Sequence, residues 1–232
     1  MEELQPLFSR NLECHLCKEK FVTMKCRSKF IKVDHYDTDF CSIYKENSVN
    51  GLLYNIFVCP KCGYSFSSDF STYFPSGTME ELISNICNKW VPYDFSGERS
   101  IKEAIRTYKL AAYSATLKKE KHVIIAGLYL RAAWLYRLQG AKQQEQRFME
   151  LAFHAYTESF SREDYRGTQI SDVRIVYLLG ELARRTGKEE TTIRYFSKVI
   201  ENRKRTVETK LIEMAQERWQ EIRAAREGKS KV

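Results

Sequence analysis

Apolar residues recur at helical spacing along most of the chain that follows residue 78. They fall three or four positions apart, first over residues 79–90 and finally over a last helix expected at residues 207–226. Thr78 and Ser100 each stand three residues before a glutamate, which is the spacing of a capping box at a helix start. The pattern therefore predicts a C-terminal part that is almost entirely α-helical.

The first 75 residues show a different pattern. Short runs rich in β-branched and aromatic residues occur at residues 21–23 and 54–58, and each run lies beside a Cys-X-X-Cys pair. Asn50-Gly51 is a turn signal between them. We expect these runs to form short strands.

The two Cys-X-X-Cys pairs, Cys14/Cys17 and Cys59/Cys62, are the most specific chemical feature. Zinc prefers four ligands in a tetrahedron, and a spacing of two residues lets both sulfurs of a pair face one ion. Gly63 follows the last cysteine, where the chain must turn with positive φ. Because four thiolates leave no open position, we expect one structural Zn²⁺. A redox dithiol or another metal is the alternative.

Three cysteines remain outside these pairs. Cys87 falls on the apolar face of an expected helix, so we interpret it as a small buried hydrophobic residue. A second metal site formed by Cys26, His35 and Cys41 stays open, although their spacing matches no standard zinc pattern.

A weak internal repeat joins residues 129–140 and 176–187. In each, a large residue is followed by a small one four positions on, Ala133 or Gly180, and by a glycine seven further on. This is the pattern of tetratricopeptide (TPR) helix pairs. Gly140 and Gly187 lie 47 residues apart rather than the 34 of a regular repeat, so irregular TPR-like hairpins are the expectation and an ordinary helical bundle is the alternative.

These patterns predict an α+β protein with two parts. Residues 1–75 form a zinc-ribbon β-module with a long β-insert. Residues 76–232 form an all-α, TPR-like helical-hairpin domain that ends in a basic helix.

Charge and composition change the picture of the second part. The net charge of +8 divides into −2 over residues 1–95 and +10 over residues 96–232, so the helices carry the basic character and suit acidic partners. The chain has no long apolar run for a membrane span and no signal-peptide pattern at its start. We therefore expect a cytoplasmic protein whose seven cysteines stay reduced.

One acidic segment invites an enzymatic interpretation. His35, Asp37 and Asp39 would share one face of a strand, where carboxylates beside a histidine perform acid–base chemistry or hold a hard metal. The other interpretation, which we favour because no nucleophile accompanies them, is a polar loop, or side chains that pair with the nearby Arg27 and Lys32.

Several residues between positions 14 and 70 form a recognisable set: the first Cys-X-X-Cys, Arg27, Asp39-Phe40-Cys41 with Tyr44, the segment Val58–Tyr64, and Phe70. The chain thereby resembles an uncharacterised bacterial family, domain of unknown function 2225. The resemblance implies a zinc ribbon followed by TPR-like helices. It implies no activity.

The favoured function is a non-enzymatic zinc-binding scaffold that binds a protein or acidic peptide through its basic helical surface. The alternative is an RNA- or DNA-binding zinc-ribbon protein that uses basic clusters such as residues 118–121, 184–188 and 203–205. An enzyme is the least favoured reading. On a TPR frame the partner-binding residues are Trp134, Arg137, Tyr177, Glu181, Arg184 and Arg185.

Overall fold

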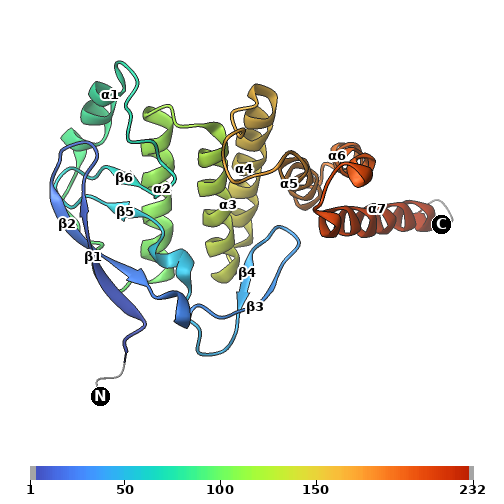
Figure 1. Ribbon diagram of the computed structural model, residues 1–232, viewed down its shortest axis with the longest axis horizontal. Coiled ribbons are helices and arrows are strands. Elements are labelled where there is room, and N and C mark those ends of the chain that lie inside the picture. The colour runs from blue at the N-terminus through green and yellow to red at the C-terminus, as the bar shows by residue number, and fades with distance from the viewer. Residues whose placement is uncertain (1–3, 230–232) are drawn as a thin grey trace.

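The protein is seen here in a computed structural model, which describes residues 4–229. Three separate antiparallel strand pairs precede seven α-helices (Figure 1). The strands are β1 Leu7–Glu13, β2 Lys20–Cys26, β3 Val33–Tyr36, β4 Ser42–Tyr44, β5 Phe57–Val58 and β6 Ser65–Phe66. The α-helices are α1 Thr78–Asn85, α2 Ile101–Leu117, α3 His122–Leu138, α4 Lys142–Arg162, α5 Asp172–Arg185, α6 Glu189–Glu201 and α7 Thr209–Lys229. Short 3₁₀ helices are η1 Ser28–Phe30, η2 Gly51–Tyr54, η3 Cys87–Lys89 and η4 Asn202–Lys204. The predicted α+β class is confirmed.

The strand predictions succeed for one run and fail in part for the other. Residues 21–23 lie within β2, which pairs with β1 over seven positions. Of residues 54–58, only Phe57–Val58 forms a strand. The Asn50 side chain accepts a hydrogen bond from the Leu52 amide (2.9 Å) and starts η2, so the chain there turns helically before it can extend.

The two predicted capping boxes also differ in outcome. At the start of α2, the Ser100 hydroxyl accepts from the Glu103 amide (3.2 Å), and the Glu103 carboxylate accepts from the Ser100 amide (2.9 Å). This box is confirmed. The one at Thr78 is wrong, because that hydroxyl donates to the Pro75 carbonyl (2.7 Å) and Gly77, with φ of 80°, is the N-cap residue.

The long helices pack as successive neighbours. α2, α3 and α4 stand side by side, and α5, α6 and α7 continue at the far end (Figure 1). Gly140 and Gly187 end α3 and α5 with positive φ, as the repeat pattern indicates. A Cβ on Gly180 would lie 2.7 Å from the Phe196 ring, so this glycine lets α5 and α6 approach closely.

One hydrophobic core runs from the cysteine region into the helices. Arg99, only 5% exposed, joins the two parts by donating to the carbonyls of Leu53 (3.2 Å) and Ile56 (2.7 Å). Burial lowers the pKa of this guanidinium. Residue 75, the predicted domain boundary, therefore falls between segments that share a core. Within residues 4–229, no helix is long and apolar enough to span a bilayer.

The β3–β4 hairpin leaves the other strands. It reaches alone beneath α3 and α4 towards α5 (Figure 1). Asp37 closes its turn, where the amides of Thr38 and Phe40 bond back to the Asp37 side chain and carbonyl (2.6 and 2.8 Å). Phe40 has φ of 67° in this turn. The tip is thus shaped to present Asp37, Thr38 and Asp39 to the helices.

Candidate metal centre and the hairpin-binding surface

The four cysteines of the two Cys-X-X-Cys pairs converge on one point. Their sulfurs all lie within 4.8 Å of one another, with Cys14 and Cys62 3.7 Å apart and Cys17 and Cys59 3.6 Å apart. Four sulfurs bound tetrahedrally to one ion by bonds of about 2.3 Å would stand about 3.8 Å apart. The cluster therefore has the dimensions of a metal site that four thiolates close.

The two pairs adopt matching backbone turns. The Lys18 amide donates to the Cys14 carbonyl (3.0 Å), and the Gly63 amide donates to the Cys59 carbonyl (2.9 Å). Lys18 and Gly63, each directly after the second cysteine of its pair, have φ of 61° and 74°. A Cβ on Gly63 would lie 2.4 Å from Trp90, so glycine is required there both for conformation and for space.

Electrostatics within the cluster favours a cation. Hydrogen bonding from Cys14 and Cys62 lowers the pKa of Cys59, whereas hydrogen bonding to Cys59 raises the pKa of Cys14 to about 12. Cys14 and Cys59 are fully buried. Several thiolates packed this closely repel one another unless a metal ion shares their charge, so the donor set fits a metal ion.

Cys26 and Cys41 lie outside this centre, whereas Cys87 lies beside it, with its thiol in a hydrogen bond with that of Cys62. Among residues 4–229, the four-cysteine group is the one cluster with metal-ligand geometry. The structure does not bring His35 together with Cys26 and Cys41, because its ring is exposed and bonds Asp34 (2.9 Å). Burial raises the pKa of the Cys26 thiol to about 11 and that of Cys41 to about 12. Cys87 is half-buried in η3.

The second notable site is the contact between the hairpin tip and α3. Asp39 is fully buried, and its carboxylate accepts from Arg137 (2.6 Å) and from the Trp134 indole (3.0 Å). Arg137 also bonds Asp37 (2.8 Å) and Glu145 (2.7 Å). One guanidinium thus serves three carboxylates. Burial acts to lower the pKa of Arg137, but its interactions with Asp39 and Glu145 raise it.

A second ion-pair group on α5 holds the middle of the tip. Arg185 donates to Asp37 (2.8 Å), to the Thr38 hydroxyl (2.7 Å) and to Glu181 (2.6 Å). The Tyr177 hydroxyl donates to the Thr38 carbonyl (2.9 Å), and the Thr38 hydroxyl donates to Glu181 (2.5 Å). The tip is therefore bound through its carboxylates and also through its backbone.

The charges around Glu181 explain how a fully buried carboxylate stays ionised. Burial alone would raise the pKa of Glu181, but Arg184 (2.7 Å) and Arg185 hold it below the usual value. The same balance applies to Asp37. Desolvation raises the pKa of this carboxylate, but the Thr38 amide and Arg185 lower it further, so that the pKa lies below its usual value. Both carboxylates carry their full charge at neutral pH.

All six residues predicted to bind a partner lie in these two groups. Trp134, Arg137, Tyr177 and Arg185 contact Asp37, Thr38 or Asp39 directly, Glu181 bonds Thr38, and Arg184 bonds Glu181. The structure thus places on this surface a ligand from the same chain. Sequence reasoning did not predict that the tip of the β3–β4 hairpin binds to this surface.

The interpretation of Asp37 and Asp39 needs correction. They pair with arginines about 100 and 150 residues away, not with Arg27 and Lys32. Arg27 instead bonds the Gln5 carbonyl (3.1 Å). The signal in the sequence was the opposite charge of an acidic turn and a basic helix face, but spacing alone does not show that they meet.

Comparison with known proteins identifies the group to which these features belong. The model of the family described as "Uncharacterized protein conserved in bacteria (DUF2225)" matches residues 7–222. The chain belongs to the DUF2225 family. The match covers the cysteine cluster, the hairpin and nearly all the helices of this DUF2225 protein. No curated protein and no solved structure matches it.

Proposed function

We propose that this DUF2225 protein is a non-enzymatic, zinc-containing adaptor. It binds an acidic segment of a partner protein through the surface of α3 and α5 that includes Arg137 and Arg185. The observation that supports this function is the bound state of its own hairpin. An acidic turn, Asp37-Thr38-Asp39, is already held there by arginine forks and by a tyrosine that bonds its backbone.

Zinc is the metal proposed for the four-cysteine centre. Four thiolates at tetrahedral spacing suit zinc, and a closed sphere leaves no position for substrate. The ion's role is to hold β1–β2 and β5–β6 together, since these short sheets have little core of their own. Seven unpaired cysteines fit the reducing cytoplasm.

The geometry favours binding over catalysis at the acidic segment. Asp37 and Asp39 are the carboxylates that suggested acid–base chemistry, yet each is occupied by arginine. A general base needs a free lone pair directed at its substrate. These two carboxylates instead attach the hairpin tip to the helices.

The contacts also favour a protein partner over nucleic acid. Lys118, in one proposed phosphate-binding cluster, is 1% exposed and pairs with Glu120. Arg184 and Arg185, in a second cluster, bond Glu181. Side chains that are committed to internal carboxylates do not release counterions from a phosphate backbone.

In the proposed mechanism, the partner's acidic segment replaces the hairpin. The hairpin is covalently attached, so its effective concentration at the surface is on the order of millimolar. It therefore weakens every competing ligand. Two α-helix pairs, α3–α4 and α5–α6, in a TPR-like arrangement hold the surface rigid while the hairpin exchanges.

The test supplies the hairpin in trans. A fluorescent peptide of residues 33–44, with Cys41→Ser, is titrated into the wild type and into Asp37→Asn/Asp39→Asn, with binding read by anisotropy. We expect the variant to bind the peptide at least tenfold more tightly, because its own tip no longer competes. A peptide with both aspartates changed to asparagine is the matched control.

Two measurements keep the test decisive. Metal content and circular dichroism verify that the double variant is folded, and Arg137→Glu placed in that variant should abolish peptide binding. If the folded variant does not bind the acidic peptide better than the control peptide, the proposed function is wrong.

A further inference from the structure

A cleft of about 860 Å³ lies on the inner side of the hairpin, between the strand pairs and α3. It adjoins the surface that binds the hairpin tip, and Trp134 and Asp39 contribute to both. Its walls come from β1, η2, α2, α3, the loop before α5, and α5 itself. Its volume is in the range of small-molecule binding sites.

Positive charge dominates the lining of this cleft. The cations are Arg10, Lys25, Arg131 and Arg174, and the carboxylates are Asp39 and Asp69. Asp39 is neutralised by Arg137. Among the ion pairs between described residues, none includes any of the four cations that line the cleft.

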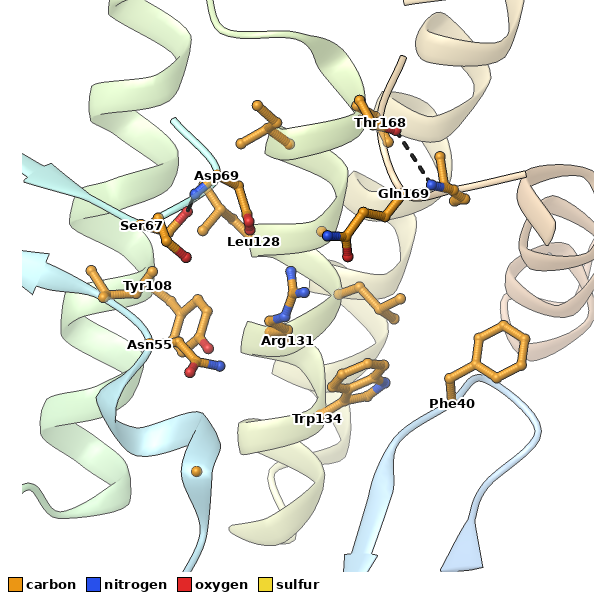
Figure 2. A pocket seen from close by; sticks show the side chains of 18 of the residues that line it. Phe40, Asn55, Ser67, Asp69, Tyr108, Leu128, Arg131, Trp134, Thr168 and Gln169 are labelled. Atoms are coloured by element: carbon orange, nitrogen blue, oxygen red, sulfur yellow. Dashed lines mark hydrogen bonds between the residues drawn. The ribbon is translucent and has the colours of Figure 1, made fainter. Parts of the chain in front are cut away.

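Arg131 occupies the middle of the cleft. Figure 2 shows its guanidinium directed into the space between Tyr108 and Asn55 on one side and Gln169 on the other. Within residues 4–229 its side chain has no hydrogen-bond acceptor. A guanidinium offers five N–H donors, so an unpaired one in a cleft is ready to bind an oxyanion.

Two further observations place a second arginine and a supporting glycine here. Arg174 lines the same cleft as Arg131, and the buried Tyr156 side chain lines it with them. Arg174 also stacks over the Phe40 ring at 4.2 Å. Gly127 leaves room for Arg131, because a Cβ at this position would stand 2.8 Å from the Arg131 Nη1 atom.

From the volume of the cleft, the excess of cations in its lining and the unpaired Arg131, we infer that the cleft binds a small organic molecule that carries a phosphate group. Arg131 and Arg174 bind the phosphate, since two planar forks match a dianionic group better than a single carboxylate. The remaining volume holds the organic part against Trp134 and Phe40, with the Asn55 and Gln169 amides available for hydrogen bonds (Figure 2). A mononucleotide has the required charge, size and planar ring.

Isothermal titration calorimetry of the metal-loaded, full-length protein tests this inference. The probes are inorganic phosphate, pyrophosphate and AMP at low ionic strength, with adenosine as the uncharged control. We expect AMP to bind and adenosine not to bind. Arg131→Gln and Arg174→Gln should each weaken AMP binding at least tenfold. Arg106→Gln is the matched control, because that exposed arginine lies on α2 over Tyr93, outside the cleft, and should bind like wild type.

Gly127→Ala provides a variant that does not threaten folding. Alanine favours the helix, and its methyl group displaces only the end of the flexible Arg131 side chain. It should keep or raise the melting temperature and still weaken AMP binding. No heat with any phosphorylated probe at millimolar concentration, or equal binding by wild type and Arg131→Gln, would overturn the inference.

Discussion

The buried contact between Asp39 and Arg137 supports a quantitative prediction. Asp39→Ala removes a fully buried carboxylate that accepts from Arg137, from the Trp134 indole and from the Cys41 amide (3.2 Å). Breaking a buried ion pair from one side costs about 3–5 kcal/mol. In this variant Arg137 keeps its ion pairs with Asp37 and Glu145, and its side chain is 20% exposed. The expected loss of unfolding free energy therefore lies near the lower limit, about 3 kcal/mol.

The loss should be visible in two assays. For a chain of this length, about 3 kcal/mol corresponds to a fall in melting temperature of roughly 6–12 °C. Urea denaturation measures the free energy of unfolding directly. Asp34→Ala is the matched control in the same hairpin, because Asp34 is exposed and, among residues 4–229, pairs only with His35; it should change nothing measurable.

A double-mutant cycle separates the ion pair from general damage. If the loss of the ion pair is the cause, the destabilisation of Asp39→Ala/Arg137→Ala should be clearly smaller than the sum of the destabilisations of the two single variants. Each single change leaves the other charged group without its partner. Additive losses, or an Asp39→Ala protein as stable as Asp34→Ala, would refute the reasoning and with it the description of the hairpin as a bound ligand.

Three further predictions follow from the structure. With the proposed zinc bound, Cys17→Ser should lower the zinc content from the expected one per chain to a small fraction by elemental analysis; full retention would contradict the four-thiolate site. Gly180→Ala should cost about 1–3 kcal/mol in urea denaturation through its clash with Phe196, and an unchanged midpoint would count against close helix packing. Because the pKa of Glu181 is lowered on folding, its contribution is complete above the ordinary value of 4.5 and is lost as pH falls through the folded pKa. Unfolding free energy measured from pH 7 to 3 should therefore fall less steeply in Glu181→Gln; equal slopes would exclude this role.

Local patterns predicted the cysteine cluster and most helices well, for a physical reason. A two-residue spacing brings two sulfurs to one side of a turn whatever the rest of the chain does, and the turn at Gly63 depends on its own φ. The Ser100 cap likewise closes within four residues. Thr78 shows the limit, since its hydroxyl is taken by Pro75, a competitor that the capping pattern does not include.

The identity of the hairpin's partner was beyond local reasoning. The sequence by itself determined a module with two Cys-X-X-Cys pairs, a series of helices, and a basic face that carries Arg137 and Arg185. Only the tertiary structure decided that this face holds Asp37 and Asp39, and that Arg131 is left unpaired in a cleft. The reason is that ion pairing depends on distance in space. Residues more than 90 positions apart meet only after the core has fixed the direction of the hairpin.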